Sequence, residues 1–237
     1  MSGHSKWSTI KHKKAALDTK RGKAFTKLIK EITVVVREGG GDPAANPRLR
    51  TLIDKTKKVN MPQENVLRAI KKGSGELPGQ MYEEQNYEGY GPGGIAIIIE
   101  VLTDNKNRAA GELRHVFSRH GGRLSEPGSV SWMFQHVGTI RVPKENVTED
   151  ILLETLFEYP IHEITQEPEN FLIYTEPKSL DQVKQALQTA HLEVKNAELE
   201  WSPQQKLSLD TPEEEQAIAF LEALDELEDV QNTYTNL

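Results

Sequence analysis

The residues near the start of the chain whose side chains could do chemistry are mostly cations. Ser5-Lys6-Trp7 and Lys11-His12-Lys13-Lys14 place several positive charges beside one aromatic ring. Lysine neutralises phosphates and releases their counterions, and a tryptophan can stack on an unpaired base. This spacing therefore predicts contact with a nucleic-acid backbone. The alternative is that the lysines are only solvated and that Trp7 packs on its own domain.

We expect the same interface to continue along the outer faces of the first helices. The candidate nucleic-acid-binding residues are Lys6, Trp7, Lys11, Lys13, Lys14, Lys20, Arg21, Lys23, Lys27, Lys30, Lys55, Lys57 and Lys58. The sequence contains no zinc-finger pattern, basic zipper or set of base-stacking aromatics. It therefore predicts electrostatic binding and gives no sequence preference.

A second group of cations lies in Thr103-Asp104-Asn105-Lys106-Asn107-Arg108, between an expected strand and an expected helix. Cations at a helix N-terminus oppose the helix dipole unless an anion is bound there. Lys106 and Arg108 are thus candidates for a secondary anion site. Capping of the helix by Asp104 or Asn105 is expected in either case.

Other patterns that could carry chemistry are weak. Gly89, Gly91 and Gly94 match a dinucleotide-binding spacing, but the segment contains a proline and leads into a strand rather than a helix. We expect a tight turn there. The seven histidines show no ligand spacing that specifies a metal, and no nucleophile signature is present. These observations predict a protein that is not an enzyme and that uses no metal or cofactor.

Charge is distributed unevenly along the chain. Residues 1–72 contain 18 Lys and Arg against 6 Asp and Glu, a net charge of +12, and the remainder carries −19. Such asymmetry points to an anionic partner for the basic part. The chain has no cysteine and no apolar run near the length of a membrane span, so a cytoplasmic protein without membrane contact is expected.

The basic part has the pattern of a small helical bundle. Phe25, Leu28, Ile32 and Val36 share one side of a helix that should end at Gly39-Gly40-Gly41. Asn46-Pro47 is a good start for a second helix. Asn60 with Gln63 resembles a capping box for a third, which Gly73 should end.

The acidic part has the pattern of a mixed α/β protein. Between Val137 and Trp201 we expect strand, helix, two strands, helix and strand, the order of a ferredoxin-like domain. The flanking segments give the same order when they are joined: a strand at 94–102, a helix at 105–119, strands at 123–125 and 130–134, a helix at 212–228 capped by Thr211, and a short strand at 230–234. The predicted fold class is α+β multidomain. The predicted domains are a basic helical domain (1–78), a ferredoxin-like domain (79–135 plus 204–237), and a second ferredoxin-like domain inserted in the first (136–203).

Several long motifs resemble the YebC/PmpR family. They are Gly3-His4-Ser5-Lys6-Trp7, Lys20-Arg21-Gly22-Lys23, Gly39-Gly40-Gly41-Asp42-Pro43, Asn46-Pro47-Arg48-Leu49-Arg50, Tyr87-Glu88-Gly89-Tyr90-Gly91-Pro92-Gly93-Gly94, Thr103 to Arg108, and Gly128-Ser129-Val130. The resemblance implies a three-domain cytoplasmic protein that binds DNA and regulates transcription. Ala109-Ala110 departs from the Thr-Val that many relatives carry.

The resemblance also implies an alternative. Mitochondrial members look like translational activators for a cytochrome c oxidase subunit, and bacterial members have been connected with ribosomes stalled on proline-rich sequences. A translation factor that binds ribosomal RNA would use the same basic face as a DNA-binding regulator. DNA, ribosomal RNA and the ribosome are thus the expected partners, and an enzyme with an unrecognised site is the third hypothesis.

Overall fold

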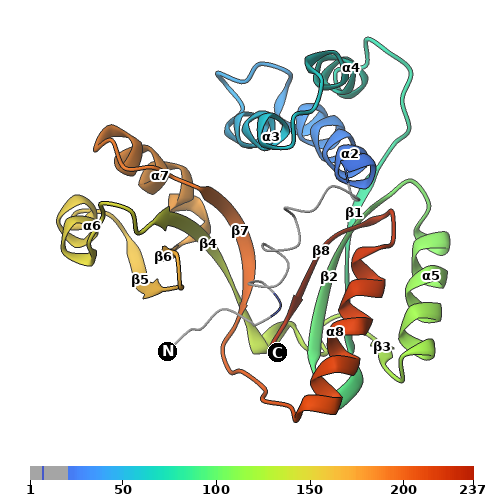
Figure 1. Cartoon of the computed structure of the whole chain (residues 1–237). Helices are drawn as coiled ribbons and strands as arrows, with labels where there is room; N and C mark the ends of the chain where they lie inside the picture. Colours follow the sequence, from blue (N-terminus) through green and yellow to red (C-terminus); the bar gives the residue numbers. More distant parts are fainter. Residues whose placement is uncertain (1–6, 8–20) are drawn as a thin grey trace. The chain divides into compact units, whose positions relative to one another are not determined.

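Arg21–Gly39 (α2) is the first of three helices that pack their apolar faces together. The computed structural model describes Trp7 and residues 21–237, and Figure 1 shows the arrangement of its elements. Pro47–Lys58 (α3) and Gln63–Gly73 (α4) complete this helical module (residues 21–73). Its core joins Ile32 and Val36 of α2 to Leu49 of α3 and Ala69 of α4. Each helix buries one apolar stripe against the other two, and this burial holds the three helices together.

The ends of these helices follow local chemistry. Asn46 caps α3, since its side chain accepts a hydrogen bond from the backbone N–H of Leu49 at 3.1 Å. Gly40 has a φ of +83°, a left-handed conformation that stops α2 as predicted. The predicted capping box at Asn60 is wrong, because Asn60 itself has a positive φ and α4 begins after Pro62 without a side-chain cap.

The described chain divides into two compact units. Residues 134–204 form one of them, which we call the inserted unit. The described residues before 134 and after 204 form the other, which we call the main unit. The helical module belongs to the main unit. The division of the chain into three domains is finer than these two units and stays a prediction.

The main unit contains a four-stranded antiparallel sheet with the order β3-β1-β2-β8. Its strands are Glu83–Tyr90 (β1), Ala96–Thr103 (β2), Arg123–Ser125 (β3) and Val230–Thr235 (β8). The helices Lys106–Arg119 (α5) and Thr211–Asp225 (α8) cover one face of this sheet (Figure 1). The core there joins Ile97 and Ile99 to Phe117 and Phe220, whose rings meet edge to face at 4.9 Å. The predicted cap of α8 is one residue off, since Asp210, not Thr211, accepts the hydrogen bond.

One predicted strand of this sheet is wrong. Val130 lies outside any strand, Ser131–Met133 (η3) is a single 3-10 turn, and Phe134 already belongs to the next strand. The reason is the buried carboxylate of Glu88, which accepts hydrogen bonds from the backbone N–H groups of Gly128, Val130 and Ser131 at 2.7–2.9 Å. Those donors are therefore unavailable to a sheet. The missing strand comes instead from β1, which the sequence analysis did not predict.

The turn between β1 and β2 is the segment with the dinucleotide-like glycine spacing. Pro92–Gly94 (η2) forms a short 3-10 turn, and the backbone N–H of Gly91 donates to the carbonyl of Ile95 at 2.8 Å. Gly93 and Gly94 both have positive φ values. The segment is thus the tight turn of a hairpin, as predicted from its proline and its following strand.

The inserted unit has its own sheet, with the antiparallel order β5-β6-β4-β7. Its elements are Phe134–Pro143 (β4), Glu149–Leu156 (α6), Ile161–Gln166 (β5), Asn170–Thr175 (β6), Pro177–Ser179 (η4), Leu180–Thr189 (α7) and Asn196–Pro203 (β7). Apart from the one-turn η4, this is the predicted order of strand, helix, two strands, helix and strand. Leu152 and Leu156 of α6 and Val183 and Leu187 of α7 are fully buried against Ile140 and Ile173 of the sheet.

Candidate nucleic-acid interface

The cations predicted to bind nucleic acid differ in their exposure. Lys23, Lys57 and Lys58 are exposed, whereas Lys27 and Lys55 are half-buried. Lys30 is buried, with 4% of its surface exposed. Lys6, Lys11, Lys13, Lys14, Lys20 and the side chain of Arg21 lie outside the described residues.

Three lysines of α2 contact the end of α8 and the residues that follow it. Lys30 Nζ lies 2.7 Å from a carboxylate oxygen of Asp229, and Lys27 Nζ lies 3.4 Å from one of Asp225. Lys23 Nζ donates to the backbone carbonyl of Glu226 at 3.2 Å. The prediction that these lysines lie on the outer face of the helix is therefore wrong for Lys30, which is buried. Lys27 is half-buried, because the end of α8 lies beside the lysine side of α2.

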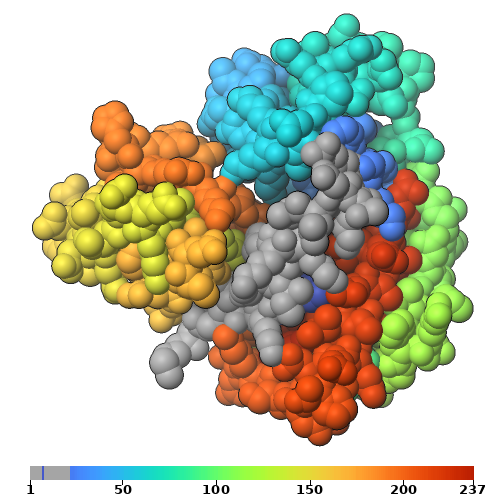
Figure 2. Space-filling model, in the orientation of Figure 1, coloured from blue at the N-terminus to red at the C-terminus, as the bar shows by residue number. Residues whose placement is uncertain are grey.

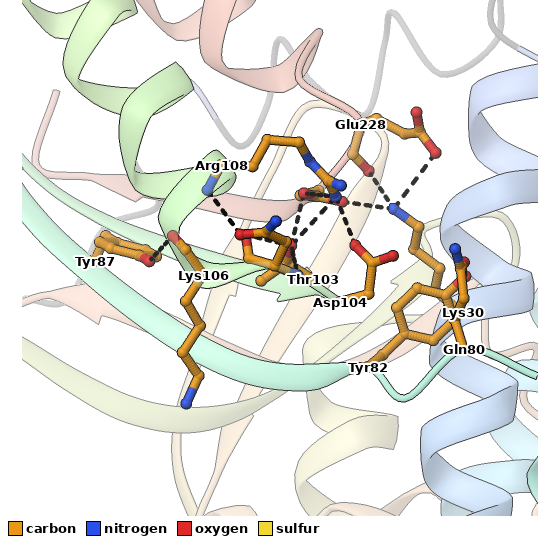
Figure 3. A network of polar contacts seen from close by, with 11 residues as sticks. Lys30, Gln80, Tyr82, Tyr87, Thr103, Asp104, Lys106, Arg108 and Glu228 are labelled. Atoms are coloured by element: carbon orange, nitrogen blue, oxygen red, sulfur yellow. Dashed lines mark hydrogen bonds and ion pairs between the residues drawn. The ribbon is translucent and has the colours of Figure 1, made fainter.

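Asp229 is the centre of this contact, and Figure 3 labels Lys30, Thr103 and Arg108, the three residues that donate to its carboxylate. Besides Lys30, its carboxylate accepts hydrogen bonds from Thr103 Oγ1 and from an Arg108 guanidinium nitrogen, both at 2.8 Å. Burial alone would raise the pKa of Asp229, but the hydrogen bonds from Lys30, Arg108 and Thr103 outweigh it and hold the pKa below its usual range. Asp229 is therefore an ionised, buried link between α2, the start of α5 and the start of β8.

The second set of predicted anion-binding cations is also engaged with carboxylates of the protein. Lys106 Nζ lies 2.6 Å from Glu83, and Arg108 bridges Asp104 at 2.7 Å and Asp229 at 2.8 Å. Hydrogen bonds to Asp229 and Asp104 raise the pKa of Arg108. As predicted, Asn105 caps α5, since its side chain accepts from the backbone N–H of Arg108. Arg108 is thus held by the buried carboxylate of Asp229, which does not support a site for an external anion there, whereas Lys106 forms an exposed surface pair.

Trp7 is not available for stacking. Only 3% of its surface is exposed, and it belongs to the apolar core between the sheet and helices of the main unit, with Ile97 and Phe220. A base cannot lie on a ring that is covered by protein. The expectation of an exposed aromatic is therefore wrong, and the alternative that Trp7 packs on protein holds, although its contacts lie in the α/β core rather than in the bundle.

Within the helical module, the exposed cations lie mainly on α3 and α4, the light-blue to cyan surface in Figure 2. Four further cations of the helical module are exposed and were not among the predicted binding residues: Arg37, Arg48, Arg68 and Lys71. Lys71 and Lys72 occupy the last turn of α4, as Lys57 and Lys58 do for α3. The helix dipole stabilises cations at helix C-termini. The position of Lys71 and Lys72 just before the helix-ending Gly73 was therefore a signal in the sequence for this pair.

Several of these exposed cations form surface ion pairs. Lys57 lies 3.0 Å from Asp54, and Arg68 lies 2.9 Å from Glu64, both within one helix. Arg48 bridges Glu38 and Glu84 at 2.8 and 3.2 Å. Exposed pairs of this kind contribute about 0–1 kcal/mol, so a phosphate can displace the carboxylate at little cost.

Nowhere in Trp7 and residues 21–237 do three or more His, Asp or Glu side chains gather closely enough to hold a metal ion. Within the same residues, each helix is too short or too polar to cross a membrane.

Comparison with known proteins agrees with this architecture. The sequence pattern described as "TACO1/YebC protein N-terminal domain" matches residues 5–76, and that described as "TACO1/YebC second and third domain" matches residues 82–237. The chain belongs to the TACO1/YebC family. The two matched ranges leave residues 77–81 between them.

TACO1/YebC relatives resemble the chain over its full length. A "probable transcriptional regulatory protein" of Desulfosudis oleivorans is 53% identical and covers 100% of this chain and 96% of its own. A protein of the same description from Chlorobaculum parvum is 50% identical, with 100% and 95% covered. The crystal structure of a conserved hypothetical protein from Aquifex aeolicus superposes with a TM-score of 0.85 at 43% identity, covering 100% of this chain and 94% of that one.

Proposed function

We propose that this protein is a regulator of gene expression that binds nucleic acid electrostatically through its first 72 residues and catalyses no reaction. The observation that carries the proposal is the charge of +12 on these residues, in a chain whose remainder carries −19. Relatives at about half identity are described as transcriptional regulatory proteins, which supports a regulatory role. A basic face confined to one part of the chain favours contact through that part alone.

The aromatic residues of this basic part favour a duplex as the ligand. Residues 1–72 contain only two aromatics, Trp7 and Phe25. Trp7 is buried in the main-unit core, and Phe25 packs against the core of the helical module. Proteins that bind single strands rely on exposed rings for stacking. We therefore infer that the cations contact the phosphates of a double helix rather than unpaired bases.

Duplex DNA is the first candidate, because the relatives are described as transcriptional regulators. A helix of ribosomal RNA is the second, because backbone contacts without base readout suit both kinds of duplex. In that case the protein acts in translation. The two are separated by which duplex binds more tightly at the same salt concentration.

The proposal is tested by fluorescence anisotropy of the full chain with labelled duplex DNA, an RNA helix and single strands of each. We expect log affinity to fall linearly with log salt concentration on duplex DNA, with a slope of magnitude roughly 4 to 8, about 0.9 for each phosphate contacted. Single strands should bind more weakly than duplexes. No measurable binding at low salt, or a slope of magnitude about 1, would overturn the proposal.

Matched triple variants locate the contact surface. One variant reverses three exposed lysines of the helical module: Lys57→Glu, Lys58→Glu and Lys71→Glu. Its control makes the same change in net charge at three exposed lysines outside the module: Lys178→Glu, Lys195→Glu and Lys206→Glu. We expect the first to lower affinity tenfold or more and the control to change it less than twofold at moderate salt. Equal losses would show that only net charge matters and would remove α3 and α4 from the interface.

A further inference from the structure

Helix α6 of the inserted unit presents apolar side chains on its outer side as well as on its inner side. Leu152 and Leu156 are fully buried in the core of the unit. Leu153 is 48% exposed, and Phe157, at the end of the helix, is 88% exposed, the largest value among the exposed large apolar residues of the described chain. A phenylalanine ring left in water at that level is unfavourable, and exposed apolar patches mark sites of association.

Leu153 and Phe157 form one continuous patch. They are four residues apart, and Phe157 retains helical backbone angles (φ −55°, ψ −36°), so the two side chains lie side by side on the helix. Asp150 and Glu154 precede them by three residues and lie along the same edge, and both are exposed. The patch therefore consists of two apolar side chains with a carboxylate row beside them.

The chain segment that carries the patch is acidic. Residues 145–177 contain nine Asp and Glu and not a single Lys or Arg. Such a surface repels phosphate, so nucleic acid is excluded as its ligand. A two-fold dimer through the same patch would place these like charges opposite one another, which also disfavours a second copy of the chain. A cationic protein surface has the complementary charge.

We propose that α6 is a docking site for a lysine- and arginine-rich protein, in which Phe157 and Leu153 enter an apolar depression and the carboxylates of α6 meet its basic rim. Aromatic residues surrounded by rim charges are the usual anchors of such interfaces. This site goes beyond the proposed function and does not rest on it.

The first test places the photo-crosslinker benzoylphenylalanine at position 157 of the full chain in cells, followed by nuclease digestion and identification of the products by mass spectrometry. We expect products that contain proteins with a large excess of Lys and Arg. A second substitution, Leu153→Asp, should abolish them. No crosslinked product, a product with a second copy of this chain, a product with nucleic acid, or products with acidic proteins would each overturn the proposal.

The second test measures binding of the purified crosslinked protein to the full chain. Phe157→Ala should weaken binding tenfold or more. The double variant Glu154→Lys, Glu158→Lys should also weaken binding, and its effect should be largest at low salt concentration. Ile151→Ala is the control on the same helix, because Ile151 lies about 120° around the axis from Phe157. It should change binding less than twofold. All variants should keep the affinity of the wild-type chain for duplex nucleic acid, which separates this site from the proposed function. Wild-type binding of the Phe157→Ala variant would overturn the proposal.

Discussion

The ion pair between Lys30 and Asp229 gives a prediction with a defined magnitude. The two side chains are each 5% exposed and meet at 2.7 Å. Asp229→Asn leaves the Lys30 ammonium buried without its nearest carboxylate; the exposed side chain of Glu228 lies 3.5 Å away, the Glu228 carbonyl 3.4 Å away and the centre of the Tyr82 ring 5.6 Å away. An uncompensated buried charge costs about 3–5 kcal/mol, so we expect a loss of about that size in the free energy of unfolding.

Lys30→Met has a smaller expected effect. Asp229 keeps its hydrogen bonds from Arg108 and Thr103, so the loss is that of one charge-assisted hydrogen bond, about 1.5–3 kcal/mol. The double variant removes both charges of the pair. We therefore expect its loss to be smaller than the sum of the two single losses by about 1–3 kcal/mol.

Urea unfolding of the four proteins, followed by circular dichroism, measures these free energies. Thermal midpoints should fall by about 2–4 °C for each kcal/mol in a chain of this size. The same variants test the revised role of Lys30, because folded Lys30→Met protein should bind duplex DNA like the wild type. Additive single losses, within about 0.5 kcal/mol, would refute the direct pairing, and a selective loss of DNA binding would return Lys30 to the interface.

The stability contributed by the Asp229 carboxylate should depend on pH in a defined direction. The pKa of Asp229 is lower in the folded chain than in the unfolded one. Its contribution to stability is therefore complete above the unfolded value of about 3.9 and is lost as the pH falls through the folded value. The stability difference between the wild type and Asp229→Asn should shrink over that range. A difference that is independent of pH down to the acid transition would contradict the lowered pKa.

Three further substitutions test other contacts. Burial would raise the pKa of Glu88, but hydrogen bonds from three backbone N–H groups lower it. Glu88→Gln should therefore reduce the free energy of unfolding by about 1.5–3 kcal/mol near pH 7, and by progressively less as the pH falls below about 4.3. Urea unfolding at several pH values measures this difference. Gly89→Ala should destabilise the main unit strongly, because its Cβ would lie 2.6 Å from the Phe117 ring and 2.5 Å from a backbone oxygen; wild-type melting would contradict this close packing. Trp7→Ala should lower the free energy of unfolding by about 3–5 kcal/mol and weaken binding to single-stranded RNA no more than to duplex DNA; a selective loss on RNA would place Trp7 back on the surface.

The elements that the sequence predicted well are those whose signals are local. The apolar stripe of α2, the Asn46 cap and the order of elements in the inserted unit all depend on residues close together in the sequence. Strand β1 was missed because Glu83-Glu84-Gln85-Asn86 is polar and only its last residues are buried. Its place in the sheet depends on pairing with the apolar strand β2, and that pairing leaves no period-2 pattern in β1 itself.

The candidate site shows a similar division. Composition alone indicated which part of the chain is basic. It could not separate cations that face solvent from those that face carboxylates distant in sequence. Lys30 and Asp229 are 199 residues apart, and nothing near Lys30 distinguishes it from Lys23. The positions of the charged residues can be read from the sequence, whereas their ion-pair partners are set by the tertiary structure.

The place of β8 in the main sheet has a consequence for how the protein is made. Strand β2, with the sequence AIIIEVLT, gains its second neighbour only when residues 230–235 pair with it. On a ribosome that adds about 5–20 residues per second, the roughly 130 intervening residues take on the order of ten seconds. Throughout that interval one edge of the most apolar strand in the sheet is open to other chains. The inserted unit can complete its own sheet within the same interval. Nascent chains released early should therefore contain a folded inserted unit next to an incomplete, aggregation-prone main unit.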